Sequence, residues 1–276
     1  MYLLNGDSKQ TLDCSDRGFQ YGDGLFETIE VRNGTPVFLD QHFQRLQRGC
    51  QRMLITSPDI TLLKAEAFQL VNGADSAVLK LIVTRGSGGR GYRQPETMRP
   101  TRLFSLHPFP EYPDNYFSHG INVRFCHTAL GLSPALAGIK HLNRLEQVMA
   151  RSEWNTDDFQ EGLMLDLNGK VIEGTMSNLF LIKDRVLMTP ILDHCGVEGV
   201  LKGIIIALAR ANSIQVMEKN ISKEDVYAAD ELFVSNSIIG IWPIKQLELQ
   251  SYAIGAVTQR LQALLLALKQ EEIHAC

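Results

Sequence analysis

The sequence predicts a mixed α/β protein with two unequal units, and three observations support that fold class. Strand-like apolar runs alternate with segments of helical apolar spacing. The 276 residues suffice for two domains of ordinary size. Pro108, Pro110 and Pro113 crowd one segment, and proline at that density continues neither a helix nor a central strand. We therefore expect domains at residues 1–110 and 111–276, joined near these prolines.

The N-terminal unit is expected to begin its regular structure with a hairpin. Residues 26–32 and 36–39 flank Asn33-Gly34, a pair that suits a tight turn between strands. Asp40 is then placed to cap a helix that ends near Met53. The other elements expected in this unit are a helix at 62–71 and strands at 77–84 and 102–106.

The C-terminal unit is expected to mix strands and helices. Asn168-Gly169 predicts a second hairpin. The other expected elements are strands at 121–126, 178–182 and 231–235, a strand that ends at Thr189, helices at 141–154 and 200–211, and a C-terminal amphipathic helix.

Composition and charge exclude several classes of protein. A net charge of −4 argues against a nucleic-acid binder, since such proteins usually carry a basic excess. The five cysteines include no Cys-x-x-Cys pair and the seven histidines show no ligand spacing, so we expect neither a disulfide framework nor a metal site. The N-terminus has no signal-peptide pattern and no stretch is long enough to span a membrane, so we expect a cytoplasmic protein.

A glycine-rich loop follows one of the expected strands. Residues 86–91 read Gly-Ser-Gly-Gly-Arg-Gly, which satisfies the pattern of a dinucleotide site. That site needs a helix directly after the third glycine, and residues 92–95 (Tyr-Arg-Gln-Pro) are unsuited to one. We instead expect a loop whose arginines (Arg85, Arg90 and Arg93) either capture a carboxylate or are simply solvated.

Two ionisable residues have neighbours that suit catalysis. Lys140 follows small and apolar residues, a setting that favours a neutral amine able to form a Schiff base. A lysine whose stem packs on apolar surface while its amine stays in water gives the same pattern and is more common. Glu173 ends a strand, where a buried acid could protonate a pyridine nitrogen, although strand-end glutamates are more often solvated.

Three further features could bind an anion. Gly199 precedes Val200 and Leu201 at a helix start, where the first amides are free and the helix dipole favours negative charge. Arg45 could donate a charge-assisted hydrogen bond, and Ser237 could donate a hydroxyl. Each of these features, taken alone, also has an ordinary structural explanation.

The combination resembles the class IV (fold-type IV) pyridoxal-phosphate enzymes, which include branched-chain aminotransferases, D-amino acid aminotransferases and 4-amino-4-deoxychorismate lyases. The resemblance extends from residue 16 to the region of residue 236. It rests on Glu173-Gly174-Thr175, Asn178-Leu179-Phe180, Leu187-x-Thr189 and Val197-x-Gly199-Val200-x-Lys202. It implies a smaller N-terminal α/β sandwich, a larger barrel-like C-terminal domain, and pyridoxal 5'-phosphate as cofactor.

The resemblance also implies roles for single residues. Lys140 would be the Schiff-base lysine and general base, and Glu173 would pair with the pyridine nitrogen. The phosphate would be held by Arg45, the amides of Val200 and Leu201, and Ser237. Arg90 and Tyr92 fall where D-amino acid aminotransferases carry an Arg and a His that grip the substrate carboxylate, and Tyr92 departs from that His.

Within the family, residues 85–92 and 137–147 look most similar to the aminodeoxychorismate lyases. The reaction that this implies converts the small molecule 4-amino-4-deoxychorismate to 4-aminobenzoate and pyruvate, in folate biosynthesis. An aminotransferase acting on D-amino or branched-chain amino acids is the alternative, because it would use the same lysine and glutamate. The family further implies a homodimer.

Overall fold

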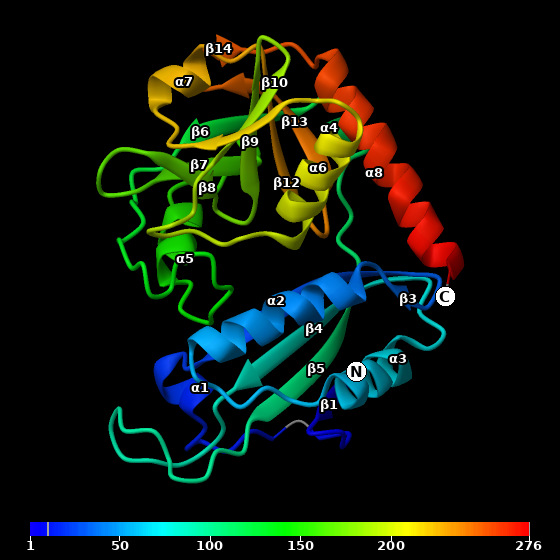
Figure 1. Ribbon diagram of the computed structural model, residues 1–276, viewed down its shortest axis with the longest axis vertical. Helices are drawn as coiled ribbons and strands as arrows, with labels where there is room; N and C mark the ends of the chain where they lie inside the picture. The colour runs from blue at the N-terminus through cyan, green and yellow to red at the C-terminus, as the bar shows by residue number, and fades with distance from the viewer. Residues whose placement is uncertain (10, 276) are drawn as a thin grey trace. The chain divides into compact units, whose positions relative to one another are not determined.

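The computed structural model describes residues 1–9 and 11–275, which form two compact α/β units (Figure 1). The first unit consists of Met1–Pro110, Ile139–Asn143 and the segment that begins at Lys269. The second consists of Glu111–Gly138 and Arg144–Leu268. Each unit has its own buried apolar core.

An antiparallel sheet forms the centre of the first unit, and its order among the described residues is β1-β5-β4-β2-β3. The strands are β1 (Tyr2–Leu4), β2 (Gly24–Arg32), β3 (Thr35–Pro36), β4 (Ser76–Thr84) and β5 (Thr101–Pro108). The helices are α1 (Arg17–Tyr21), α2 (Leu39–Arg52) and α3 (Ile60–Val71). Phe43 of α2 and Leu63 of α3 join the strand residues Leu79 and Leu81 in one core, which holds these helices to the sheet.

The hairpin predicted at Asn33-Gly34 is confirmed. Both residues have positive φ angles, 50° and 75°, as a tight turn between twisted strands requires. The prediction that Asp40 caps the next helix is wrong. The chain turns at Phe38, whose φ is 57° and whose ring is buried, so α2 begins one residue before Asp40 and Asp40 lies in its first turn.

A closed barrel forms the second unit. Among the described residues the strand order is β11-β10-β9-β12-β13-β6-β7-β8, β14 pairs with β13, and β8 also pairs with β9. The strands are β6 (Ile121–Phe125), β7 (Glu161–Leu165), β8 (Val171–Gly174), β9 (Asn178–Lys183), β10 (Val186–Pro190), β11 (Val216–Lys219), β12 (Glu231–Asn236), β13 (Gly240–Leu247) and β14 (Gln250–Ser251). The register pair that closes the ring joins Glu173 to Asn178.

Helices follow or connect the barrel strands. They are α4 (Asn115–Ser118), α5 (Leu145–Arg151), α6 (Val200–Ala211), α7 (Lys223–Tyr227) and α8 (Ala256–Ala275). The mixed α/β class and the barrel-like second unit that the sequence predicted are therefore confirmed, and α6 has the predicted bounds.

The helix predicted at 141–154 is shorter than expected. It begins only at Leu145, because the residues before it are held by β2 as extended chain. His141 forms an isolated bridge with Leu25, and Leu142 N donates to the carbonyl of Gly24 at 3.0 Å. This segment contains Lys140, so the sheet of the first unit sets the position of that lysine.

Candidate active site

Lys140 is held from two sides. Its carbonyl accepts a hydrogen bond from Phe26 N at 3.1 Å, and its amine lies 4.3 Å from the centre of the Phe26 ring. The side chain is half-buried rather than fully solvated. An ammonium over an aromatic face gains a favourable electrostatic contact with the ring. The amine is thus kept at a defined place among apolar groups, which suits a nucleophile better than a freely moving surface lysine.

Arg45 is bound to the carboxylate of Glu27, a residue that the sequence motifs did not single out for the site. Arg45 Nε donates to Glu27 Oε1 at 2.9 Å, Arg45 Nη2 donates to Oε2, and His42 Nδ1 lies 2.6 Å from Oε2. Burial alone would raise the pKa of Glu27, but the charge of Arg45 and the hydrogen bonds from His42 and Arg45 lower it to about 2. Glu27 is therefore ionised at neutral pH and orients the guanidinium.

His42 connects Arg45 to Lys140 electrostatically. Burial lowers the pKa of His42, the hydrogen bond and charge of Glu27 oppose this, and the positive charges of Arg45 and Lys140 lower it further. The ring is neutral at pH 7, and its bond to Glu27 assigns the proton to Nδ1. Nε2 is buried and has no hydrogen-bond partner among the described residues. The positive charges of two predicted residues, Arg45 and Lys140, therefore both lower the pKa of the His42 imidazole.

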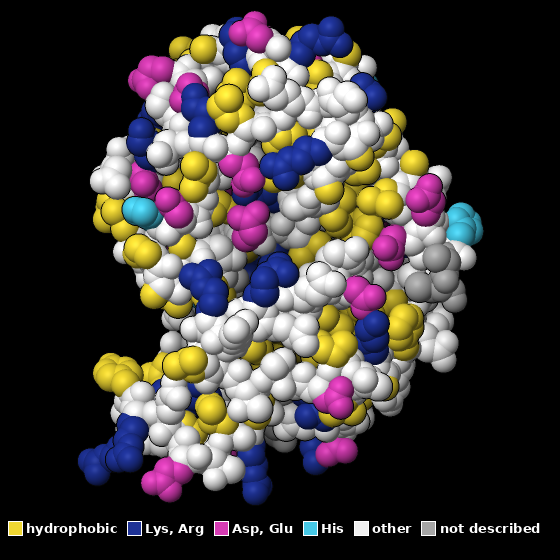
Figure 2. Space-filling view, viewed as in Figure 1, with side chains coloured by type: hydrophobic (Ala, Val, Ile, Leu, Met, Phe, Trp, Pro, Cys, Tyr) yellow, Lys and Arg dark blue, Asp and Glu magenta, His cyan; other side chains and the backbone are white. Residues whose placement is uncertain are grey.

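The predicted substrate residues Arg90 and Tyr92 lie on the exposed loop between β4 and β5, and the side chain of Tyr92 is 88% exposed. Figure 2 shows basic side chains (dark blue) at the tip of this loop, whose basic residues are all arginines. The described chain forms no helix between these strands, so the context that a dinucleotide site needs is missing.

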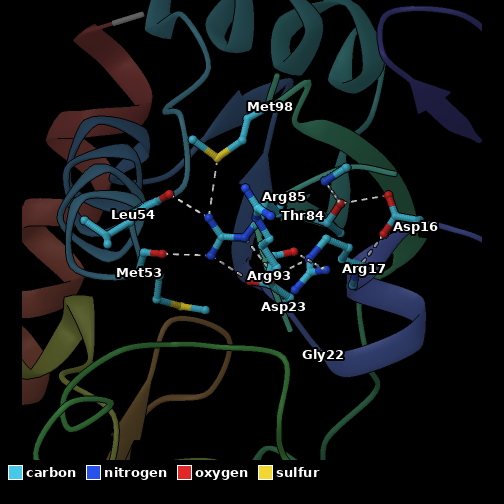
Figure 3. Close-up of polar contacts among 12 residues, drawn as sticks. Asp16, Arg17, Gly22, Asp23, Met53, Leu54, Thr84, Arg85, Arg93 and Met98 are labelled. Carbon is cyan, nitrogen blue, oxygen red and sulfur yellow. Dashed lines mark hydrogen bonds and ion pairs between the residues drawn. The ribbon is translucent and has the colours of Figure 1, made fainter. Parts of the chain in front are cut away.

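Arg85, at the base of that loop, is not available to a substrate. It is 5% exposed and donates to both carboxylate oxygens of Asp23, at 2.8 and 3.0 Å. It also donates to the carbonyls of Met53 and Leu54 at 2.9 and 2.6 Å (Figure 3). The expectation that Arg85 joins a solvated or carboxylate-binding cluster is therefore wrong, because its donors are used inside the first unit.

Glu173 is a buried acid in the second unit, not a solvated one. Glu173 is 4% exposed. Its carboxylate accepts hydrogen bonds from Val197 N at 2.8 Å and from Gln147 Nε2 at 3.4 Å. Burial lowers the pKa of Arg144, and the charges of Glu173 and Glu146 oppose that change, so a guanidinium also lies near this carboxylate. These contacts hold the Glu173 carboxylate in one position at the end of β8. A carboxylate that pairs with a ring nitrogen needs such a fixed position.

Asn178 connects Glu173 to the start of α6. The strand register pairs Asn178 with Glu173 on one side and with Ser235 on the other. Its Nδ2 donates to the carbonyl of Val197 at 2.9 Å, while Val197 N donates to Glu173. A Cβ at Gly199 would lie only 2.0 Å from Asn178 Oδ1, so glycine is needed where the chain enters the helix.

The start of α6 can receive an anion. Gly199 is its N-cap, and no side chain among the described residues caps it, so the amides of Val200 and Leu201 point out of the first turn. Ser237 lies half-buried in the turn between β12 and β13. The nearby Ser235 Oγ is buried and has no hydrogen-bond partner among the described residues. Hydroxyl and amide groups without hydrogen-bond partners at a helix start are suited to binding a phosphate.

Glu27, His42, Gln147, Arg144 and Asn178 lie next to the candidate site residues and were not among the residues predicted from the sequence. Glu27 carried a usable signal, since it lies among Leu25, Phe26 and Ile29 in one strand, and a glutamate buried there needs a cation. Within residues 1–9 and 11–275, no group of three or more His, Cys, Asp or Glu side chains could hold a metal. The same residues include no helix with the length and apolar character of a membrane span.

Known proteins similar to this chain agree on one family. Residues 24–247 match the family described as amino-transferase class IV. An aminodeoxychorismate lyase of Vibrio harveyi is 33% identical, with 95% of this chain and 98% of that protein covered. The crystal structure of 4-amino-4-deoxychorismate lyase from Pseudomonas aeruginosa matches with a TM-score of 0.93 and 42% identity, over 96% and 98% of the two chains. A branched-chain amino acid aminotransferase from Escherichia coli matches with a TM-score of 0.86 and 25% identity, over 98% and 94%. This chain therefore belongs to the class IV aminotransferase family.

Proposed function

We propose that the protein is a pyridoxal-phosphate-dependent lyase that converts 4-amino-4-deoxychorismate to 4-aminobenzoate and pyruvate, a reaction of folate biosynthesis. The observation that carries this proposal is the 42% identity with a 4-amino-4-deoxychorismate lyase over 96% of the chain. The aminotransferase structure reaches 25% over a similar length. The Pseudomonas aeruginosa lyase thus shares more of this sequence than that aminotransferase does.

The residues present fit pyridoxal 5'-phosphate. The uncapped start of α6, with the amides of Val200 and Leu201, would bind the phosphate together with Ser237 and Arg45. Glu173 would hold the ring nitrogen from its buried position. When bound, the cofactor would supply an electron sink and an aldehyde for the amine of Lys140.

Lys140 would perform the proton transfer. Its amine removes the proton from the amine-bearing ring carbon of the substrate. The C–O bond to the enolpyruvyl group then breaks, the ring becomes aromatic, and the departing enolpyruvate gains a proton to become pyruvate. Because aromatisation makes this elimination strongly downhill, the protein mainly has to orient one C–H bond. Arg90 and Tyr92 would bind the substrate carboxylate, and the exposure of Tyr92 leaves it accessible for that role.

An aminotransferase acting on D-amino or branched-chain amino acids is the second candidate. The similarity to the Escherichia coli branched-chain enzyme favours it. Incubation of the purified protein with 4-amino-4-deoxychorismate, while pyruvate and 4-aminobenzoate are measured, tests the first proposal. D-Alanine or leucine with 2-oxoglutarate tests the second. Glutamate formation in this second assay, with no pyruvate or 4-aminobenzoate released from 4-amino-4-deoxychorismate, would replace the lyase proposal by the aminotransferase one.

We also propose that the protein is a cytoplasmic homodimer. Leu145, Val148 and Met149 of α5 are 69%, 61% and 53% exposed, an apolar group that a second copy would cover. Described cysteines Cys14, Cys50, Cys126 and Cys195 are free thiols, which suits a reducing compartment. Light scattering of the protein and of Val148→Glu tests the dimer, since a charge in a buried interface should yield monomers.

A further inference from the structure

Arg17 contacts the β4–β5 loop on both sides of Tyr92. Its Nη1 donates to the carbonyl of Gly91 at 3.0 Å and to that of Arg93 at 3.4 Å. The guanidinium also lies 5.0 Å from the centre of the Tyr21 ring, and that ring packs against Tyr92 with centroids 5.7 Å apart. Arg17 therefore binds the backbone on both sides of Tyr92 directly, and it contacts the Tyr92 ring only through Tyr21.

Arg17 itself is rigidly placed. It is 4% exposed, and its Nε donates to Asp23 Oδ2 at 2.9 Å, beside the bonds from Arg85 to the same carboxylate (Figure 3). Its backbone N donates to the carbonyl of Gly86 at 2.9 Å, at the base of the loop. A buried guanidinium with a carboxylate partner keeps a single orientation.

The helix that carries Arg17 is tied to both strands from which the loop emerges. Asp16 caps α1 by accepting from Gly18 N at 2.8 Å. Its other oxygen accepts from Thr84 Oγ1, at the end of β4, at 2.8 Å and from Thr101 Oγ1, at the start of β5, at 2.7 Å. Arg17 thus begins from a fixed point relative to both stems of the loop.

The loop needs such an anchor. Gly86, Gly88, Gly89 and Gly91 all have positive φ angles, and glycine backbone loses the most conformational entropy on ordering. The middle of the loop is solvent-exposed and forms no regular structure in the described chain. Charge-assisted hydrogen bonds to two carbonyls in this stretch therefore contribute directly to its order.

We propose that Arg17 is a positioning residue that holds Tyr92 and Arg90 in place for the substrate carboxylate, so that it controls substrate affinity and not the chemical step. This inference rests on the proposed function for the roles of Tyr92 and Arg90. Its structural half, that Arg17 orders the loop, can be measured without any substrate.

The first measurement is the rate at which trypsin cleaves the cofactor-loaded protein after Arg90 or Arg93. Ordered loops resist cleavage, and the loss of Arg17 should expose both sites. We expect Arg17→Gln to be cleaved about tenfold faster than the unmodified protein. This corresponds to a tenfold smaller equilibrium constant for the ordered loop over the open loop. Arg102→Gln is the matched control, because it removes an ion pair with Glu66 in the same unit, and the hydrogen bonds of the Arg102 side chain within residues 1–9 and 11–275 go to Glu66 and not to the loop or Arg17.

The second measurement is KM and kcat for pyruvate release. Arg17→Gln should raise KM about tenfold and leave kcat unchanged, because it removes binding that the ground and transition states share. Tyr21→Leu, at a residue that is 38% exposed, should shift both measurements in the same direction by less and is safe for folding. Arg17→Lys should fall between Arg17→Gln and the unmodified protein, since an ammonium can reach one carbonyl but not span two.

Unchanged cleavage in both Arg17→Gln and Tyr21→Leu overturns the inference. Faster cleavage with an unchanged KM also overturns it, because Arg17 would then order the loop without affecting substrate binding. A fall in kcat with an unchanged KM overturns it as well, because Arg17 would then affect the chemical step. If the unmodified protein releases no pyruvate, the proposed function fails instead. The KM comparison is then made with D-alanine, while the cleavage rates still decide whether Arg17 orders the loop.

Discussion

Arg45 Nε donates a 2.9 Å hydrogen bond to Glu27 Oε1 at a place where Glu27 is 1% exposed and Arg45 is 8% exposed. The arginine comes from α2 and the glutamate from β2. A buried ion pair is strongly destabilised when one partner is removed, because the other charge is left without compensation. Arg45 is therefore needed for the stability of the fold, in addition to the phosphate binding that we propose for it.

Glu27→Gln should lower the free energy of unfolding at pH 7. The pKa of Glu27 is about 2 in the folded protein against 4.5 for an ordinary glutamate, so its ionised form stabilises the fold fully above pH 4.5. That contribution, on the order of 3 kcal/mol, is lost as the pH falls from 4.5 towards 2. Urea unfolding should show a steep loss of stability in this window for the unmodified protein and a flatter profile for the variant.

Asp40→Asn is the control for that experiment. Asp40 forms an exposed pair with Lys64, and such pairs contribute about 0–1 kcal/mol. Equal stability of Glu27→Gln and the unmodified protein at pH 7 would contradict the role of the buried pair.

Lys140→Ala should keep the fold and lose covalent attachment of the cofactor. Borohydride reduction followed by mass spectrometry of the tryptic peptides measures this directly. Lys80→Ala is the matched control, because Lys80 also lies over the Phe26 ring, at 5.7 Å, and has no proposed role in chemistry. A reduced adduct on a peptide other than the one with Lys140, or full turnover by Lys140→Ala, would rule out the assignment.

Glu173→Gln should lower kcat by about two orders of magnitude, the usual effect of removing a proton-transfer or charge-stabilising group. The variant should fold, because the amide oxygen of glutamine can still accept from Val197 N. Steady-state pyruvate release and the visible absorbance of bound cofactor measure the two effects. Glu248→Gln, which alters an exposed carboxylate that accepts from Tyr227 Oη, should leave kcat unchanged. If both variants behave alike, Glu173 does not contact the ring nitrogen.

Gly199→Ala should weaken cofactor binding about tenfold, since the new methyl group would displace Asn178 and disturb the start of α6. Equilibrium dialysis against pyridoxal 5'-phosphate measures the affinity. Gly203→Ala, on the same helix, is the control, because no described atom other than its chain neighbours and the helix's own backbone lies within 4 Å of its added Cβ. It should retain the affinity and slightly stabilise the helix. Similar affinities for the two variants would argue against phosphate binding at this helix start.

Local sequence chemistry predicted much of the fold. The two Asn-Gly turns and α6 follow from turn geometry and helical spacing, which act over a few residues. Strand β13 was missed because it contains Pro243, and proline argues against a strand with neighbours on both sides. The sheet tolerates it opposite Phe233, where the register with β6 is irregular a few residues later. That compensation depends on neighbours far apart in the chain.

The candidate site was less accessible to sequence reasoning. The pattern at Glu173 suggested an acid at a strand end, but its burial depends on Gln147 and Val197 from other segments. Arg85 looked like a loop arginine, whereas Asp23 and the carbonyls after α2 bind it inside the unit. Such pairings join residues that are dozens of positions apart, so the local spacing of residues in the sequence does not predict them.

Closure of the barrel and assembly of the candidate site depend on the same two residues. Glu173 and Asn178 form the closing register pair, and both bind the main chain at Val197. A ligand that binds only the closed barrel stabilises it by mass action. If pyridoxal 5'-phosphate binds there, as we propose, the supply of the B6 vitamin would determine how long newly made chains survive proteolysis, as well as how many of them are active.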